Sequence, residues 1–327
     1  MRDRLGAAVL LAGLAVVTAC GREAAPAGAA SSLGTPVAAQ APAPAPAAAT
    51  AFDGARAWAH LERLVAFGPR PSGSAALGES RAYITRELAA IGLTVQSQRF
   101  TAATPLGAVE MENLLVRIPG RRPDRILLTG HYDTKRMQNA RFVGASDGGS
   151  SAAFLLEAAR VLKARPGEFT YELIWFDGEE ATCRDWNECG SATAPDNTYG
   201  SRYYVDAARK AGVLPSLKAM ILVDMIGDRD LQVRRDSNSA NWLNDLVWAA
   251  ADRLGHGRVF VPDATTIEDD HIPFVRAGVP SIDIIDLDYP YWHTPDDTLD
   301  KVSQRSLQIV GDVVVTALPD IEARLAR

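Results

Sequence analysis

The fold of this 327-residue chain is decided by the stretch ELIWFDGEE, residues 172–180. Its first five residues form a run of strand length, and Trp175 within it is expected in the core. A glycine turn and two adjacent acids follow at once. Three further runs have the length and composition of buried strands: 125–128, 219–223 and 281–285.

Segments with the period of a helix lie between and after these runs, near residues 149–163, 199–211, 239–254 and 303–325. Strands that alternate with helices predict an α/β fold. Near-continuous apolar strands are typical of a sheet that is buried on both faces. We therefore expect a three-layer sandwich, with a mostly parallel, mixed central sheet flanked by helices.

Potential metal ligands follow nearly every predicted strand. In chain order they are His131, Asp133, Asp147, Glu179, Glu180, Asp224 and His293. A single Asp after a strand is often a helix cap or a turn former. The carboxyl ends of parallel strands, however, meet at one edge of a sheet, where active sites gather. So many ligands at this edge predict a metal site.

Zinc suits this set of side chains, because it accepts imidazole nitrogen and carboxylate oxygen. A single ion would need only Asp147, Glu180 and His293. Two ions, bridged by Asp147, would use five side chains: His131, Asp147, Glu180, Asp224 and His293. Both arrangements leave a position open for water or a substrate carbonyl, which is typical of a catalytic site. Glu179 stands next to a proposed ligand and is the candidate general base or acid.

The formal net charge is −6 and the pI is near 5.5. Proteins that bind phosphate backbones carry clustered Lys and Arg on one face, so this composition makes no case for a nucleic-acid partner.

The amino terminus predicts export. Arg2 and Arg4 precede an apolar run, Leu5–Ala19, that is too short for a comfortable membrane span. The run ends Val-Thr-Ala-Cys, which resembles the lipobox at which bacteria acylate a cysteine, here Cys20. We expect a lipid-anchored protein of the periplasm or cell envelope. The alternative is a plain signal peptide with an incidental cysteine.

Composition divides the chain into three parts: a lipoprotein signal peptide at residues 1–20, an Ala/Pro-rich tether at 21–50 and a catalytic domain at 51–327. We expect a monomer. Cys183 and Cys189 lie in one probable loop, and an exported protein can oxidise such a pair to a disulfide. The other interpretation, half of a zinc site, lacks a second Cys or His pair nearby.

Eight segments of the domain resemble, in the correct order, the zinc aminopeptidases of metallopeptidase family twenty-eight. They are GPRPSGS (68–74), GHYDTK (130–135), VGASDGG (143–149), WFDGEEA (175–181), LVDMIG (222–227), EDDHIPF (268–274), AGVPS (277–281) and WHTPDD (292–297). The resemblance implies a zinc-exopeptidase-like fold.

Several residues resemble one branch of this family, the animal-type glutaminyl cyclases. They are the double acid Asp269-Asp270 before His271, Trp292 before the last ligand, Trp186 after DGEEA, and Tyr-Gly-Ser-Arg at 199–202. Such enzymes convert an N-terminal Gln or Glu of peptides and proteins to pyroglutamate, with release of ammonia from Gln. Asp283 departs from the pattern, because the animal enzymes have a histidine there.

The resemblance implies one zinc on Asp147, Glu180 and His293, with Glu179 as proton shuttle. Asp224 and Asp269 would then form an acidic network with Glu179, and Trp186 and Trp292 would line the substrate pocket. His271 is expected to open a helix and not to bind metal.

Two other functions remain open. In a two-zinc aminopeptidase, His131 and Asp224 would help to bind a second ion and Glu179 would activate a bridging water. A non-catalytic binding protein on the same fold would have no need of the buried acids, which destabilise an empty site.

Overall fold

The computed structural model describes residues 51–327. The signal peptide, Cys20 and the tether predicted for residues 1–50 lie outside the described residues.

The centre of the domain is a six-stranded sheet with the order β1-β2-β4-β3-β7-β10. Its last four strands in that order run parallel, whereas β2 pairs antiparallel with both β1 and β4. The strands are β1 (Val95–Thr104), β2 (Gly107–Ile118), β3 (Arg122–His131), β4 (Phe169–Phe176), β7 (Leu217–Asp224) and β10 (Ser281–Ile285). The mixed, mostly parallel sheet is confirmed, and the β1–β2 hairpin is an addition that the apolar runs did not reveal.

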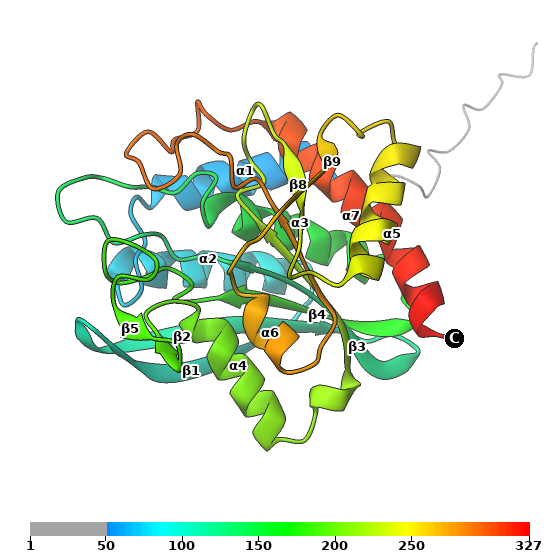
Figure 1. The fold of residues 1–327 in the computed structure, drawn as a ribbon, viewed down its shortest axis with the longest axis horizontal. Helices are drawn as coiled ribbons and strands as arrows, with labels where there is room; N and C mark the ends of the chain where they lie inside the picture. Colours follow the sequence, from blue (N-terminus) through cyan, green and yellow to red (C-terminus); the bar gives the residue numbers. More distant parts are fainter. Residues whose placement is uncertain (1–50) are drawn as a thin grey trace, which may run out of the picture. The chain divides into compact units, whose positions relative to one another are not determined.

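Helices cover both faces of this sheet (Figure 1). One layer consists of α1 (Gly54–Ala66), α2 (Ala75–Ala90), α3 (Gly149–Lys163), α5 (Asn241–Arg253) and α7 (Gln304–Leu325). The other consists of α4 (Tyr199–Lys210) and α6 (Ile272–Arg276). Short elements complete the fold: β5 (Gly190–Ser191), β6 (Ala194–Pro195), η2 (Leu214–Ser216), β8 (Val233–Asp236) and β9 (Phe260–Thr265).

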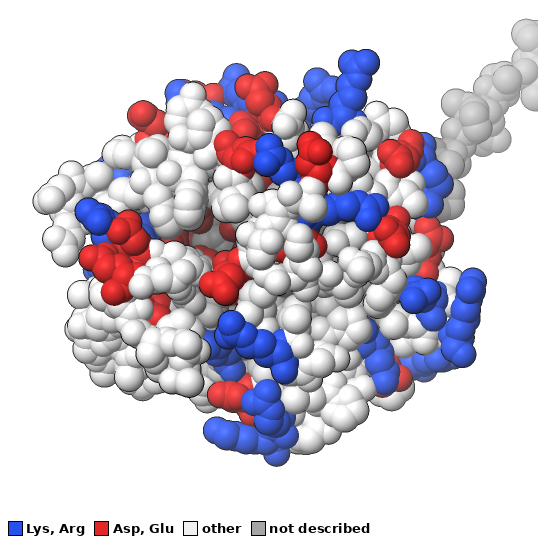
Figure 2. All heavy atoms as spheres, viewed as in Figure 1, with Lys and Arg blue, Asp and Glu red and all other residues white. Residues whose placement is uncertain are grey.

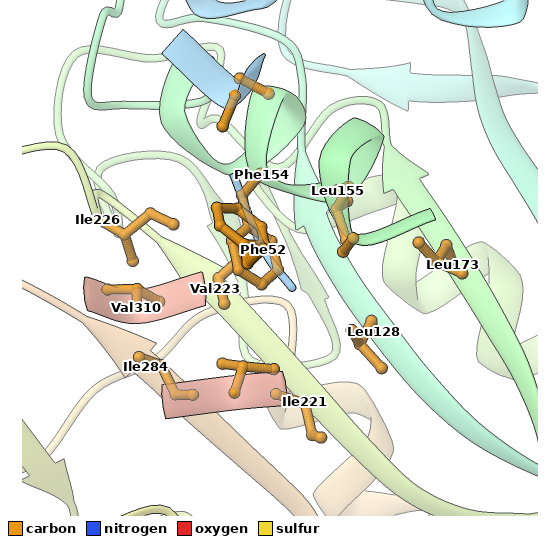
Figure 3. Close-up of a cluster of buried hydrophobic side chains, with 14 of the residues drawn as sticks. Phe52, Leu128, Phe154, Leu155, Leu173, Ile221, Val223, Ile226, Ile284 and Val310 are labelled. Carbon is orange, nitrogen blue, oxygen red and sulfur yellow. The ribbon is translucent and has the colours of Figure 1, made fainter. Parts of the chain in front are cut away.

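Side chains that alternate along the strands build a separate core on each face. Leu128 and Leu173 belong to the core under α1, α3, α5 and α7, whereas Leu127 and Ile174 belong to the core under α4 and α6. In the larger core Phe52 stacks on Phe154, with 5.2 Å between ring centroids (Figure 3). The aromatic pair attaches the start of the described chain to α3.

The register of the parallel strands aligns their carboxyl ends. His131, the last residue of β3, pairs with Phe176 at the end of β4, and Asp224 at the end of β7 pairs with Ile285 at the end of β10. The loops that leave these strands therefore start at the same edge of the sheet.

Candidate active site

Two groups of possible metal ligands share Asp147 at the carboxyl edge of the sheet. One group is His131, Asp147 and Asp224, and the other is Asp147, Glu180 and His293. Within each group the ligand atoms lie within 4.8 Å of one another. All five predicted ligands are thus brought together, in an arrangement that can hold one ion or two.

The distances show how Asp147 joins the two groups. Its Oδ1 lies 3.3 Å from Nε2 of His131, and its Oδ2 lies 3.5 Å from Nε2 of His293. The same His131 nitrogen is 3.1 Å from Oδ1 of Asp224. Nε2 of His293 is 3.1 Å from Oε2 of Glu180.

Backbone geometry that ordinary residues avoid places these side chains. Gly148 has φ +76°, and a Cβ there would stand 2.2 Å from the carbonyl oxygen of Asp133. Met225 and His293 adopt left-handed conformations, with φ of 44° and 51°. Strain of this kind persists only where surrounding contacts enforce it, and it concentrates at functional sites.

A buried carboxylate and a buried guanidinium hold the loop that carries Asp147. Asp297 accepts hydrogen bonds from the backbone N–H groups of Ser146, at 2.8 Å, and Asp147, at 3.1 Å. Arg70 donates to the carbonyl oxygens of Val143, at 2.8 Å, and Gly144, at 3.1 Å. Both residues stand in the family segments, but nothing local in the sequence reveals that they support this loop.

The donor set fits a zinc ion. Two buried oxygen atoms of the ligand groups, Oδ2 of Asp147 and Oε1 of Glu180, have no hydrogen-bond partner. Buried polar atoms are normally paired, and adjacent buried carboxylates destabilise a fold unless a cation compensates them. Imidazole nitrogen and carboxylate oxygen are the ligands that zinc accepts.

Asp147 and Glu180 have very different pKa values, although both carboxylates are buried at this centre. Burial and the neighbouring Glu180 raise the pKa of Asp147 to about 7. Burial also acts on Glu180, but His293 and Lys135 outweigh it and lower the pKa of that group to about 2. Nζ of Lys135 lies 3.8 Å from Oε2 of Glu180 and donates to the Ala181 carbonyl at 2.8 Å.

Glu179 is adjacent to the possible metal ligands and is buried together with Asp224 and Asp269. Its Oε2 is 3.7 Å from Nδ1 of His131, and its backbone N–H donates to Asp133. Burial raises the pKa of Glu179 well above its usual value, and the negative charges of Asp269 and Glu180 add to this although His131 opposes it. Burial and the nearby Asp224 raise the pKa of Asp269 to about 6.

His271 belongs to neither ligand group. It immediately precedes α6 and is fully buried, with Nε2 3.1 Å from Asp236 and Nδ1 3.6 Å from Asp283. Asp283, which stands where the resemblance leads one to expect histidine, therefore faces a histidine from another segment.

A pocket of about 260 Å³ opens over the two groups. Its walls include Trp186 and Trp292, and its lining also includes Glu179 and Asp269. Trp292 is 41% exposed, and its ring lies 4.4 Å from that of His293. On the face drawn in Figure 2 a hollow is visible, with carboxylate residues in and beside it.

Cys183 and Cys189 are joined by a disulfide, which closes the loop that carries Trp186. Asp196 holds the start of this loop by accepting hydrogen bonds from the backbone N–H of Cys183, at 2.8 Å, and from Thr182, at 2.6 Å. Trp175, in contrast, is fully buried and donates to the Ala152 carbonyl, as its core position requires.

Between residues 51 and 327, no helix has both the length and the apolar character needed to cross a membrane.

Comparisons with known proteins identify relatives of the chain. The model of peptidase family M28 matches residues 113–318. A glutaminyl-peptide cyclotransferase of Drosophila melanogaster is 28% identical over 256 residues, which cover 70% of each chain. The solved structure of an Acidobacteriales bacterium glutaminyl cyclase has a TM-score of 0.78 and 39% identity, and the match covers 88% of this chain and 100% of that one. A leucine aminopeptidase precursor from Bacteroides thetaiotaomicron has a TM-score of 0.76 and 27% identity, over 83% of this chain and 98% of its own.

Proposed function

The chain belongs to peptidase family M28, and on this premise we propose that it is a zinc-dependent glutaminyl-peptide cyclotransferase. It would convert the N-terminal Gln, or Glu, of peptides and proteins to pyroglutamate, with release of ammonia from Gln. The observation that carries this proposal is the 39% identity to a glutaminyl cyclase along that protein's whole length.

One zinc ion would be held by Asp147, Glu180 and His293. Bound there, it would polarise the γ-carbonyl of the substrate glutamine and stabilise the charge that develops on its oxygen. In this arrangement His131 and Asp224 need no second ion, because they bind each other at 3.1 Å.

Glu179 would transfer the proton. The α-amine of the substrate attacks its own γ-carbonyl carbon, Glu179 takes a proton from that amine, and the carbon–nitrogen bond of the side-chain amide breaks as the proton passes to departing ammonia. A buried carboxylate with a raised pKa, next to Asp269, is suited to hold a proton between these two transfers.

Trp186 and Trp292 would hold the glutamine side chain against the amine. Both line the pocket beside Glu179, and flat apolar walls favour a compact substrate while they exclude water. Exclusion of water matters here because hydrolysis of the amide would compete with cyclisation.

One observation favours a second candidate, a two-zinc aminopeptidase. The group His131, Asp147 and Asp224 is complete and buried, so it could bind another ion. Glu179 would then activate a water bound between the two metals.

The decisive experiment compares two peptides, Gln-Ala-Ala and Leu-Ala-Ala, with the zinc-loaded protein and follows the products by mass. We expect loss of ammonia from the first, no cleavage of the second, and about one zinc per chain. Release of free leucine with two zinc ions per chain would instead establish the aminopeptidase.

The variant Glu179→Gln tests the shuttle in the same assay. We expect kcat to fall by roughly 10²- to 10⁴-fold, the usual contribution of general acid–base catalysis, with zinc content unchanged. Glu157→Gln is the matched control, because Glu157 is also a buried glutamate but lies in α3. A Glu179→Gln protein with full activity would exclude this role.

For the amino terminus we propose export and acylation at Cys20, on the motif alone. Radiolabelled palmitate should enter the wild-type protein and not a Cys20→Ala variant. Equal labelling of the two would contradict the lipobox interpretation.

A further inference from the structure

A second and larger cavity, of about 850 Å³, adjoins the pocket. The two cavities share three lining residues, Trp186, Trp292 and His293. The walls of the second cavity are the segment 135–139, which follows β3, and the disulfide-closed loop around Trp186. A peptide whose first residue occupies the pocket can therefore continue into this cavity past Trp292.

The rim of this cavity has unusually exposed apolar side chains. Leu106, in the turn between β1 and β2, is 55% exposed, and Trp292 is 41% exposed. Each lines the cavity, although the turn and Trp292 lie far apart in the sequence. Exposed apolar groups that converge on one hollow are typical of a binding surface.

The acidic groups of the cavity already have partners. Asp185 pairs with Arg184, with 2.8 Å between carboxylate oxygen and guanidinium nitrogen. Glu188 accepts hydrogen bonds from the backbone N–H groups of both residues, at 3.1 Å and 2.9 Å. These contacts lie within one short loop, in which Arg184 offsets the charge of Asp185 and the backbone holds the carboxylate of Glu188, which keeps its negative charge.

Two further basic residues line the cavity, Lys135 and Arg136, and only one of them lies close to a carboxylate. Lys135 is buried, donates to the carbonyl oxygen of Ala181 and lies close to Glu180. Its positive charge therefore interacts with a proposed metal ligand and is not available to a peptide in the cavity. Arg136 is exposed and donates only to the carbonyl oxygen of Ser72, at 3.0 Å. Among residues 51–327 it has no carboxylate partner, so the cavity has one cationic group available.

We propose that this cavity binds the second and third residues of the substrate peptide, and that Arg136 selects an acidic side chain at one of these positions. The inference rests on the proposed cyclisation of N-terminal Gln. The cavity, at about 850 Å³, is more than three times as large as the pocket of about 260 Å³ that would hold the first residue, so it has the volume for two further residues. Arg136 is thus a specificity-determining residue of the enzyme.

The test measures kcat/KM for ammonia release from amidated tripeptides, so that no terminal carboxylate interferes. The series is Gln-Ala-Ala, Gln-Glu-Ala, Gln-Lys-Ala, Gln-Ala-Glu and Gln-Ala-Lys. We expect the wild type to prefer Glu over Lys at one position by about three- to tenfold at low salt, and the preference to shrink at high salt. Arg136→Gln should remove the preference and Arg136→Glu should reverse it, with the preference measured in each protein as the ratio of kcat/KM for the Glu peptide to kcat/KM for the Lys peptide.

Arg209→Glu is the matched control, because it makes the same change in net charge at an exposed arginine in the last turn of α4. It should leave the preference unaltered. Cyclisation without discrimination between Glu and Lys, or an equal effect of Arg209→Glu, would overturn the role of Arg136 while the proposed function stands. No ammonia from any peptide would contradict the proposed function and this inference with it.

Discussion

Asp147 contacts a histidine of each ligand group through a different carboxylate oxygen, so small changes in its position affect both groups. Its place is set by hydrogen bonds to its own backbone amide and to that of the preceding residue. Asp297 holds the amides of Ser146 and Asp147, and Tyr289 donates to Asp297 at 2.7 Å. Supporting contacts of this kind orient metal ligands and tune their affinity.

Replacing Asp297 by Asn should weaken zinc binding without unfolding the protein. The amide nitrogen of Asn cannot accept the hydrogen bond that one carboxylate oxygen receives. We expect zinc affinity to fall by roughly 10- to 100-fold, measured by competition with a coloured chelator. Asp300→Asn, at an exposed aspartate paired with Lys301, should leave the affinity unchanged. Equal affinities for the two variants would contradict this support role.

A second buried acid, Asp286, should make stability depend on pH. Burial raises the pKa of Asp286 from 3.8 to about 7, although it accepts hydrogen bonds from the backbone N–H groups of Gln232 and Asp288. Because the folded pKa is the higher one, the folded state binds the proton more tightly. The contribution to stability is therefore complete below about pH 4 and is lost as the pH rises through 7.

The variant Asp286→Asn should lack this dependence. From pH 5 to pH 8 its free energy of unfolding, measured with urea, should improve relative to wild type by about 1–3 kcal/mol. Zinc-dependent effects are common to both proteins and cancel. A constant difference across this pH range would show that Asp286 is already ionised at pH 5.

At the scale of elements, one wall of the pocket is the loop that the disulfide closes. The middle of this loop is held by Asn197, which donates to the carbonyl oxygen of Trp186 at 3.1 Å. The Cys183–Cys189 bond closes a seven-residue ring around this tryptophan. None of the proposed zinc ligands lies within the ring.

Converting both cysteines to serine should therefore affect substrate binding more than metal binding. We expect KM for Gln-Ala-Ala to rise by about three- to tenfold, since the loop must be ordered when substrate binds. Zinc content should stay constant, as measured by atomic absorption. An unchanged KM would show that Asp196 and Asn197 order the loop without the disulfide.

At the scale of the whole molecule, the proposed zinc ligands come from three loops, which follow β3, β4 and β10 at the carboxyl edge of the sheet. A ligand that binds only the folded state stabilises it in proportion to the logarithm of its concentration over Kd. Zinc bound at Asp147, Glu180 and His293 should thus stabilise the entire domain. The effect arises because these residues are far apart in the unfolded chain.

Removal of zinc by EDTA should abolish activity and lower Tm, and added zinc should restore both. At a zinc concentration of 1,000 times Kd the stabilisation would be about 4 kcal/mol. Scanning calorimetry with and without zinc measures the change. His293→Ala should show a much smaller shift, and a shift as large as that of wild type would place the stabilising metal elsewhere.

Much of the fold could be predicted from local sequence patterns. The runs before His131 and Asp224 are continuous apolar strands, and their ends place these two side chains at one edge. The hairpin of β1 and β2 was not predicted, because the burial of β1 is irregular and gives no clear period-2 signal. That hairpin contributes Leu106 to the larger cavity.

The sequence by itself determined the fold class, the possible metal ligands and Glu179, because strand composition, turn glycines and family segments are properties of neighbouring residues. Only the tertiary structure decided that Asp297 supports the amide of Asp147, 150 residues away, and that Arg136 faces a cavity beside Trp292. Such contacts depend on the three-dimensional meeting of loops from different strands. No local pattern encodes which loops meet.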